Sequence, residues 1–419
     1  MSPRRRAAHW RLLLLLPLGL FHEGRAWAQT DPAPPAGVSP TPQAAAAATS
    51  AEDQKLLEEI QQAAGPGAAK PAAEAPPAAA AAPPARGTNP FSNLFNPAMS
   101  ANGLFLGSLA TSLPGQKGLH GGLQAQELEV QLTANVDPYF SANLVASLPN
   151  GANLGLEEGY LTSIPQIAGF GFRAGKIKVP FGRENGTHTH ALPFIEKSLV
   201  GNAVFGEEGL NQASVEATKL LPLPWYSLLT LTVLDGRDQV LLGSPNSDVL
   251  GGFLGSRSVF DLTDDSTLEL GLSYAAGGGP DRKLAQAVGA HLTFKWRPAR
   301  DAATSSAVVS LEGIASRQPD RLDEGAHLLP HQPAGFYGYV QWQLAQRWYV
   351  GARFEYLTDW SFPSANKMRQ SAVLVLAPTE FSAFRLQVNA TELPGIAVPL
   401  VEGLLQVNFT IGAHPAHSY

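Results

Sequence analysis

The sequence contains no cysteine, only 3 methionines and, beyond its first 28 residues, no long apolar run. Without cysteine there are no disulfides and no thiolate metal ligands, so backbone hydrogen bonds and packing must hold the fold together. No stretch after residue 28 approaches the roughly eighteen consecutive apolar residues of a membrane-spanning helix. Basic residues are a minority as well, and the net charge of −6 argues against nucleic acid as a partner.

Residues 1–28 have the pattern of a secretory signal peptide. Arginines precede the apolar run LLLLLPLGLF, and the small-residue motif AWA places the cleavage point after Ala28. The segment holds five arginines and one glutamate, so its removal changes the net charge from −6 to −10. The mature chain therefore has no general attraction to anionic lipid.

Residues 29–100 are dominated by alanine and proline and predict a disordered linker, because such a segment has little apolar bulk to bury. A short helix is expected near residues 50–64, where Ser50 and Asp53 resemble a capping box. A marginal solvated helix and an oligomerising helix are both compatible with this pattern. The remaining residues, 101–419, are expected to form one folded domain.

Strict alternation of apolar and polar residues marks this second part of the chain and predicts an all-β fold. It recurs in the segments LEVQLTANV, FSANLVASL, STLELGLSY, AVGAHLTFKW, WYVGARFEY and FSAFRLQVNA. A strand of this kind has one apolar and one polar face. Either a soluble sandwich or an outer-membrane barrel would explain it, and the barrel would turn its apolar face toward lipid.

The connections favour the membrane barrel, because short and long loops alternate along the chain as they do in bacterial transmembrane barrels. Aromatic residues lie beside the short turns, as in a membrane girdle; examples are Tyr139, Trp225, Trp296, Trp342 and Trp348. Counting strands predicts a transmembrane antiparallel β-barrel of about 16 strands, with 14 as the alternative. The predicted location is the outer membrane of a Gram-negative-type bacterium.

Residues 181–211 interrupt the pattern of strands and are expected to fold into the lumen and narrow it. A lumen of this width is otherwise open to water, and the many glycines of the segment allow sharp turns. Lys176, Lys178 and Arg183 form the best basic cluster for contact with an anion. A structural role for these charges in the wall is the alternative.

The same segment contains His188 and His190, which would project to one side of an extended chain. Neutral imidazoles are good zinc ligands, and Glu184 and Glu196 are candidates for further ligands. A structural or pore-lining role competes with metal binding. A second pair, His414 and His417, would lie at the periplasmic end of the barrel and could not join the first.

Several motifs resemble a group of bacterial outer-membrane proteins known as porin-like or as zinc-regulated TonB-dependent outer membrane receptors. They are DPYFSANLVASL, LEEGYLTS, FRAGKIKVPFGREN, HTHALPFIEKSLV, FGEEGLN and the ending IGAHPAHSY. The segment GKIKVPFG is also similar to the phosphate-selective porins O and P. The resemblance implies the location and the fold. About 320 residues are too few for the roughly 22 strands and plug of a TonB-dependent receptor.

The function predicted from these observations is passive diffusion of small hydrophilic solutes or ions through a porin-like channel. A non-conducting zinc-binding or receptor-type barrel linked to metal uptake is the alternative. No enzyme is expected, because the chain has neither a GxSxG nor an HExxH motif. No cofactor is expected apart from zinc. The expected partners are outer-membrane lipid and the solutes, with a homotrimer expected by analogy with general porins.

Overall fold

The computed structural model describes residues 97–412 except 112–118, 152, 238–239, 243–248, 279–282 and 323–327. The predicted signal peptide, most of the linker with its short helix, and the pair His414 and His417 lie outside the described residues. Among the described helices, none is long and apolar enough to cross a bilayer.

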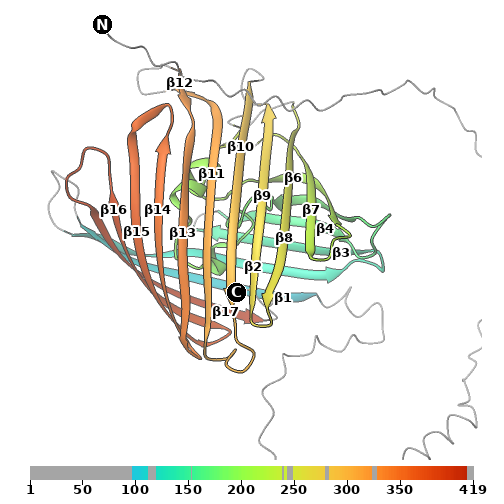
Figure 1. Cartoon of the computed structure of the whole chain (residues 1–419), viewed down its shortest axis with the longest axis horizontal. Coiled ribbons are helices and arrows are strands. Elements are labelled where there is room, and N and C mark those ends of the chain that lie inside the picture. Colours follow the sequence, from blue (N-terminus) through green and yellow to red (C-terminus); the bar gives the residue numbers. More distant parts are fainter. Residues whose placement is uncertain are drawn as a thin grey trace, which may run out of the picture. The chain divides into compact units, whose positions relative to one another are not determined.

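The described part of the chain is almost entirely antiparallel sheet (Figure 1). The first strands are β1 (Ala98–Thr111), β2 (Leu119–Asn135), β3 (Phe140–Pro149), β4 (Gly155–Ser163), β5 (Gly171–Lys178), β6 (Asn211–Leu220), β7 (Tyr226–Leu234) and β8 (Gly251–Thr263). They are followed by β9 (Ser266–Gly278), β10 (Leu284–Trp296), β11 (Ser306–Leu322), β12 (Leu328–His331), β13 (Pro333–Ala345), β14 (Trp348–Asp359), β15 (Phe362–Thr379), β16 (Ser382–Glu392) and β17 (Leu400–Gly412).

Each strand pairs with its neighbours in sequence, and β1 pairs with both β2 and β17, so the sheet closes on itself. The short β12 and the adjoining β13 both pair with β11 and are separated by Gln332, so they form one interrupted strand. The fold is therefore a closed barrel of sixteen antiparallel strands, as the sequence predicts. Ala98 to Ser100, which the sequence analysis placed in the linker, belong to the first strand.

The apolar side chains of the strands face outward and the polar ones face inward. In β9, Leu270, Leu272 and Tyr274 are exposed, whereas the alternate residue Ser273 is buried. In β10, the apolar residues Val288 and Leu292 are likewise exposed on the outer face. An exposed apolar outer face with a buried polar inner face is the arrangement of a barrel that lies in lipid.

The aromatic residues beside the short turns support the same conclusion. Exposed rings at this end of the strands are those of Tyr139, Trp225, Tyr226, Trp342 and Trp348. Trp296 and Trp342 lie close together, with ring centroids 6.2 Å apart. Amphipathic rings at this level match the interface between acyl chains and headgroups.

One predicted long loop is wrong. The polar segment TDWSFPSANKMRQ, residues 358–370, predicts one of the long loops, but β14 continues to Asp359 and β15 begins at Phe362. The two strands are joined by a tight turn at Trp360 and Ser361, where Asp359 Oδ1 accepts from the Ser361 backbone N–H at 2.8 Å. The polar sequence there reflects strands that continue past the apolar band.

The outward orientation of Leu231 gives a test of the lipid-facing surface. Leu231 lies in the middle of β7 and is 54% exposed. Leu231→Arg is expected to lower the free energy of unfolding in lipid vesicles by about 2–4 kcal/mol, because the charge would enter the acyl region. Leu223→Arg, in the short turn before β7, is the control and should cost about 0–1 kcal/mol. Equal losses in urea titrations of the two variants would contradict this orientation.

Candidate functional site

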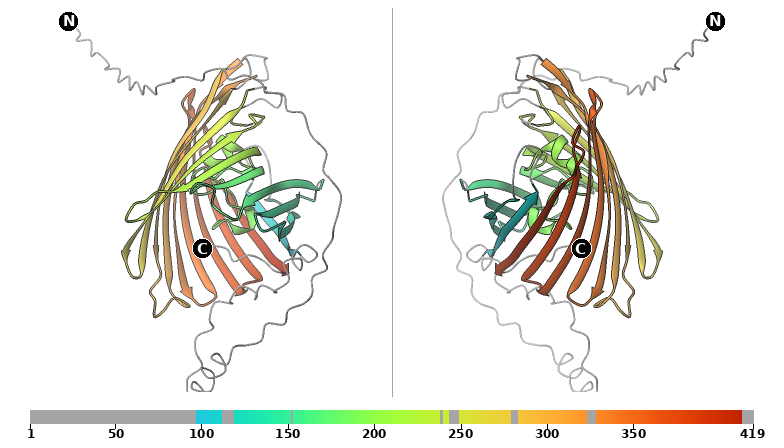
Figure 2. Two further views of the ribbon diagram at one scale, coloured as in Figure 1. Left: turned by 90° about the vertical axis from the view of Figure 1, so that its right-hand side faces the viewer. Right: turned by 90° about the vertical axis from the view of Figure 1, so that its left-hand side faces the viewer.

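The loop between β5 and β6, Val179 to Leu210, packs against the inner face of the barrel (Figure 2). It contains a short 3₁₀ turn, η1 (Thr189–Ala191), and one helix, α2 (Leu199–Phe205). This is the segment that the sequence analysis placed in the lumen as residues 181–211. Its contacts fall into an apolar cluster, a row of arginines and a group of carboxylates.

The two ends of the loop are tied together by Asn185. Its Nδ2 donates to the Val179 carbonyl at 2.7 Å, and its Oδ1 accepts from the Leu210 backbone N–H at 2.8 Å. The Val179 N–H also donates to the Leu210 carbonyl at 2.9 Å, which extends the β5–β6 ladder. The loop therefore leaves and re-enters the wall at one point.

Gly182 allows the loop to approach the wall closely. Its φ of +61° lies in the left-handed region, and a Cβ atom there would lie 1.6 Å from Glu312 Oε1 of β11. The Gly182 N–H donates to Ser273 Oγ at 2.9 Å, and the Arg183 N–H donates to Glu312 Oε2 at 3.0 Å. A side chain at position 182 would push the loop away from these acceptors.

Aromatic residues of the loop form an apolar cluster with residues of the wall. The rings of Phe181 and Phe205 lie 4.8 Å apart, and Phe194 lies 5.8 Å from the ring of Tyr339 on β13. The other buried members include Val200, Val204, Phe253, Ile314 and Tyr337. Inward-facing apolar residues of the wall are thus covered by the loop.

Three arginines on adjacent strands hold the backbone of the loop. Arg353 on β14 donates to the Glu196 carbonyl at 2.9 Å and stacks over the ring of Phe194. Arg369 on β15 donates to the Lys197 carbonyl at 2.9 Å. Arg385 on β16 donates to the carbonyls of Leu192 and His190 at 2.8 and 3.0 Å. Hydrogen bonds from charged donors are stronger than those between neutral groups.

The start of α2 is capped by side chains of both the loop and the wall. Ser198 Oγ accepts from the Gly201 N–H, and the Ser198 N–H and hydroxyl both donate to Glu184. Glu355 on β14 accepts from the Leu199 N–H at 2.6 Å. Ser198 is therefore the N-cap of α2, and Glu184 in turn holds Ser198 in place.

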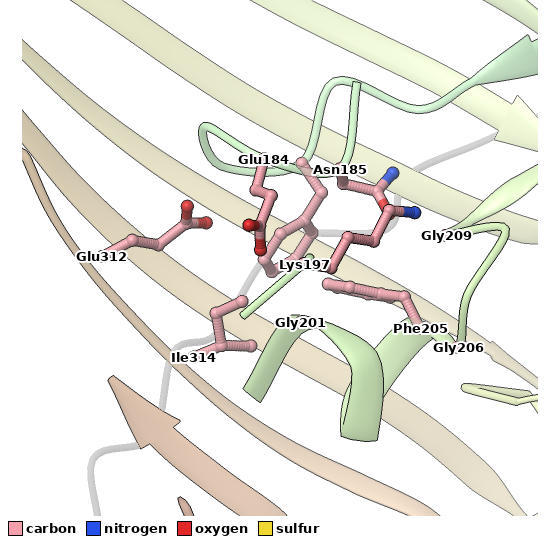
Figure 3. A pocket seen from close by; sticks show the side chains of 10 residues that line it. Glu184, Asn185, Lys197, Gly201, Phe205, Gly206, Gly209, Glu312 and Ile314 are labelled. Atoms are coloured by element: carbon pink, nitrogen blue, oxygen red, sulfur yellow. The ribbon is translucent and has the colours of Figure 1, made fainter. Parts of the chain in front are cut away.

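Glu184 and Glu312 point toward one small cavity between the loop and the wall (Figure 3). Burial raises the pKa of Glu184, partly offset by Arg353 and by its hydrogen bonds from Ser198. Lys197, which also lines the cavity, has its pKa lowered to about 8 by burial and by repulsion from Lys178. Tyr337 donates to Glu312 at 2.6 Å.

His188 lies among carboxylates of β2 and β4. Its Nδ1 lies 3.2 Å from Glu129 Oε2 and 3.3 Å from Glu157 Oε1, and its Nε2 lies 3.0 Å from Glu158 Oε2. His190 Nδ1 is 3.5 Å from the same Glu129 oxygen. Burial alone would lower the pKa of His188, but the hydrogen bonds to the three glutamates outweigh it and raise the pKa to about 11.

A β-bulge brings Glu157 and Glu158 to the same side of the wall. Val145 pairs with Glu158 and Ala146 pairs with Leu156, so Glu157 is the extra residue of β4. Successive residues of a regular strand would point to opposite faces, whereas both glutamates here are buried, with 3% and 6% of their surface exposed. The bulge is what doubles the negative charge beside His188.

The predicted basic cluster is divided among separate partners. Lys178 is buried in an ion pair with Glu157, and the half-buried Lys176 donates to the Leu156 carbonyl at 2.6 Å. Arg183 lies 3.5 Å from Glu269 of β9. The three side chains therefore contact separate acceptors of the wall, and anion contact by this cluster stays a prediction.

The predicted metal ligands are divided as well. Among the described residues, the one group of three or more side chains with metal-ligating geometry is Glu129, Glu157 and His188. Glu184 instead caps α2, and Glu196 accepts from Asn389 at 2.8 Å and pairs with Arg369 at 3.3 Å. His188 was thus predicted as a ligand, whereas the carboxylates beside it come from the strands.

Comparison with known proteins yields similarity at two levels. No family model matches the sequence. A curated relative is an uncharacterised protein of Aquifex aeolicus, 27% identical over 357 residues, which covers 72% of this chain and 73% of the relative. That similarity extends over most of the barrel without assigning an activity.

Among solved structures, the chain resembles the outer membrane channel DcaP of Acinetobacter baumannii with a TM-score of 0.52 and 8% identity over 75% of this chain and 96% of that one. An anion-selective porin from Comamonas acidovorans also has a TM-score of 0.52 and 8% identity, and the match covers 75% of this chain and 100% of that one. OprB of Pseudomonas putida has a TM-score of 0.50 and 8% identity, and the match covers 75% of this chain and 94% of that one. These likenesses support the porin part of the predicted resemblance, and the receptor part stays a prediction.

The closed barrel of sixteen strands agrees with the fold of these structural neighbours. Its apolar outer face and the aromatic rings beside the short turns are those of a barrel that lies in lipid. The chain is a bacterial outer-membrane β-barrel with the fold of the porins.

Proposed function

We propose that the protein is a channel for passive diffusion of small hydrophilic solutes or ions, with the loop Val179 to Leu210 setting its width. A barrel of sixteen strands encloses a lumen wide enough for water unless something fills it. The observation that carries the proposal is the anchoring of this loop on distant parts of the wall. It is held by the carboxylates of β2 and β4 and by the arginines of β14, β15 and β16.

The charges near the loop favour a channel of weak selectivity. The wall carries carboxylates on β2 and β4 and arginines on β14 to β16, and most of these charges are paired. A pore selective for anions would instead need rings of one positive sign. Charges of both signs line the wall, so neither cations nor anions should be strongly excluded.

Conductance of the purified protein in planar lipid bilayers tests this function. Discrete steps of current in potassium chloride, with a reversal potential near zero in a salt gradient, are the expected result. Heat-denatured protein from the same preparation is the control. Folded protein that inserts into the bilayer and gives no steps would support the non-conducting barrel instead. A homotrimer would show steps in groups of three.

A further inference from the structure

We propose that Glu129, Glu157 and His188 form a site for a divalent transition-metal cation that joins the loop to the wall. One oxygen of each carboxylate and a nitrogen of His188 all lie within 4.8 Å of one another. Glu129 lies on β2, Glu157 lies in the bulge of β4, and His188 is the residue immediately before η1. Three separate segments therefore converge on one point, and two of them belong to the rigid sheet.

Glu158 orients the histidine for this role. A carboxylate accepts hydrogen bonds, so the 3.0 Å contact between His188 Nε2 and Glu158 Oε2 places a proton on Nε2. A cation that replaces the proton on Nδ1 would bind the lone pair of that nitrogen, which faces both Glu129 and Glu157. A histidine held by a carboxylate through its other nitrogen is the common arrangement around protein-bound metals.

A second observation also points to a cation. Glu127 is only 8% exposed, and its Oε2 is buried with no hydrogen-bond partner. The same holds for Oε2 of Glu157. Glu127 interacts electrostatically with Glu129 and Glu157, so these unsatisfied oxygens belong to one region. Leaving a buried carboxylate oxygen unpaired is costly, and a cation between the carboxylates would remove that cost.

The charge balance agrees with a divalent ion. Glu129, Glu157 and Glu158 surround His188, Glu127 interacts electrostatically with two of them, and Lys178 forms an ion pair with Glu157. With Lys178 and a protonated His188 these charges sum to −2, and a doubly charged ion on a neutral His188 changes the sum to −1. One imidazole nitrogen with carboxylate oxygens suits zinc or a similar transition metal, whereas calcium and magnesium prefer oxygen ligands throughout.

Zinc binding to the purified, folded, tag-free barrel in detergent tests the site by isothermal titration calorimetry with zinc chloride alone. A background variant with His120, His414 and His417 replaced by alanine removes other histidines outside the proposed site. One zinc per chain is expected in this background. Glu129→Gln and His188→Ala are each expected to weaken binding at least about tenfold.

His291→Ala is the matched control. His291 is a buried histidine on β10 whose Nε2 lies 3.2 Å from the single carboxylate of Glu269. Zinc affinity should be unchanged in this variant. Heat-modifiable electrophoretic mobility shows for every variant that the barrel is folded, and Glu129→Gln preserves side-chain volume.

Two results would overturn the proposal. One is the absence of stoichiometric zinc binding by the folded background protein. The other is zinc binding that persists undiminished in Glu129→Gln and His188→Ala, or that is lost equally in His291→Ala. Since the readout is equilibrium binding, it is independent of whether the barrel conducts, and a failed conductance experiment leaves it unaffected.

Discussion

Replacing residues 183–208 by a short Gly-Ser linker is expected to raise the single-channel conductance about two- to fivefold, because the loop occupies part of a lumen that sixteen strands leave wide. The change suits the geometry of the chain. The Val179 N–H donates to the Leu210 carbonyl, so the two ends of the loop are already paired just outside the replaced residues. A few linker residues can therefore close β5 and β6 as a hairpin without disturbing the wall.

The shortened loop should also pass larger neutral solutes, which liposome-swelling rates with sugars of increasing size would measure. The control shortens the connection between β16 and β17 by replacing residues 394–398 with a Gly-Ser linker of three residues. Those residues join two strands outside the packed loop, so conductance should be unchanged. Equal conductance of the loop deletion and the full chain would place the narrowest part of the lumen elsewhere.

The fold could be predicted because alternation of apolar and polar residues has one consequence in a strand. In β9, Leu270 and Leu272 must share one face of the strand, and Glu269 and Ser273 must share the other. The face with the leucines then points toward lipid and the face with the polar residues points away from it. Sixteen such strands, with short turns and aromatic rings at one end, require little further information. The ends of the strands were predicted less accurately, because the polar residues near Trp360 belong to β14 and β15 where a loop was expected.

The contacts of the site could be predicted only in part. The glycines and charges of the loop indicated that it folds inward, and His188 was identified as a potential ligand. Its partners depend on the bulge at Glu157, which turns two successive glutamates to one side. Such a bulge follows from the pairing of β3 with β4 over their whole length. No local motif in LEEGYLTS predicts the bulge.

The roles of the arginines were also beyond sequence reasoning. The alternation in WYVGARFEY and FSAFRLQVNA places Arg353 and Arg385 on the polar face, whereas Arg369 falls in the predicted loop at residues 358–370. Their partners are backbone carbonyls of a segment more than 150 residues earlier, as the separation of 157 between Arg353 and Glu196 illustrates. Contacts of this kind depend on the path that the loop takes along the inner face of the wall. Alternation along a strand carries no information about it.

Arg369 gives the second large expected effect. Arg369→Met is expected to lower the free energy of docking of the loop by about 2–3 kcal/mol, because it removes charge-assisted hydrogen bonds from buried acceptors. Arg369 Nε lies 2.7 Å from Glu355 Oε1, and its other nitrogens reach the Lys197 carbonyl and Glu196. Glu355 would retain Arg353 and the Leu199 N–H, which keeps the loss below that of an isolated buried charge.

Trypsin cleavage after Lys197 measures this docking directly, because the carbonyl of that peptide bond is the acceptor of Arg369. When opening is fast relative to cleavage, the cleavage rate follows the population of the open loop, and 2–3 kcal/mol corresponds to an increase of about 30- to 150-fold. Arg347→Met, in the exposed turn between β13 and β14, is the matched control and should leave the rate unchanged. Arg369→Lys should give an intermediate rate, since an ammonium keeps the charge but cannot serve Glu355 and the Lys197 carbonyl at once. Equal rates for Arg369→Met and the unsubstituted chain would mean that the arginines of the wall accompany the loop without holding it.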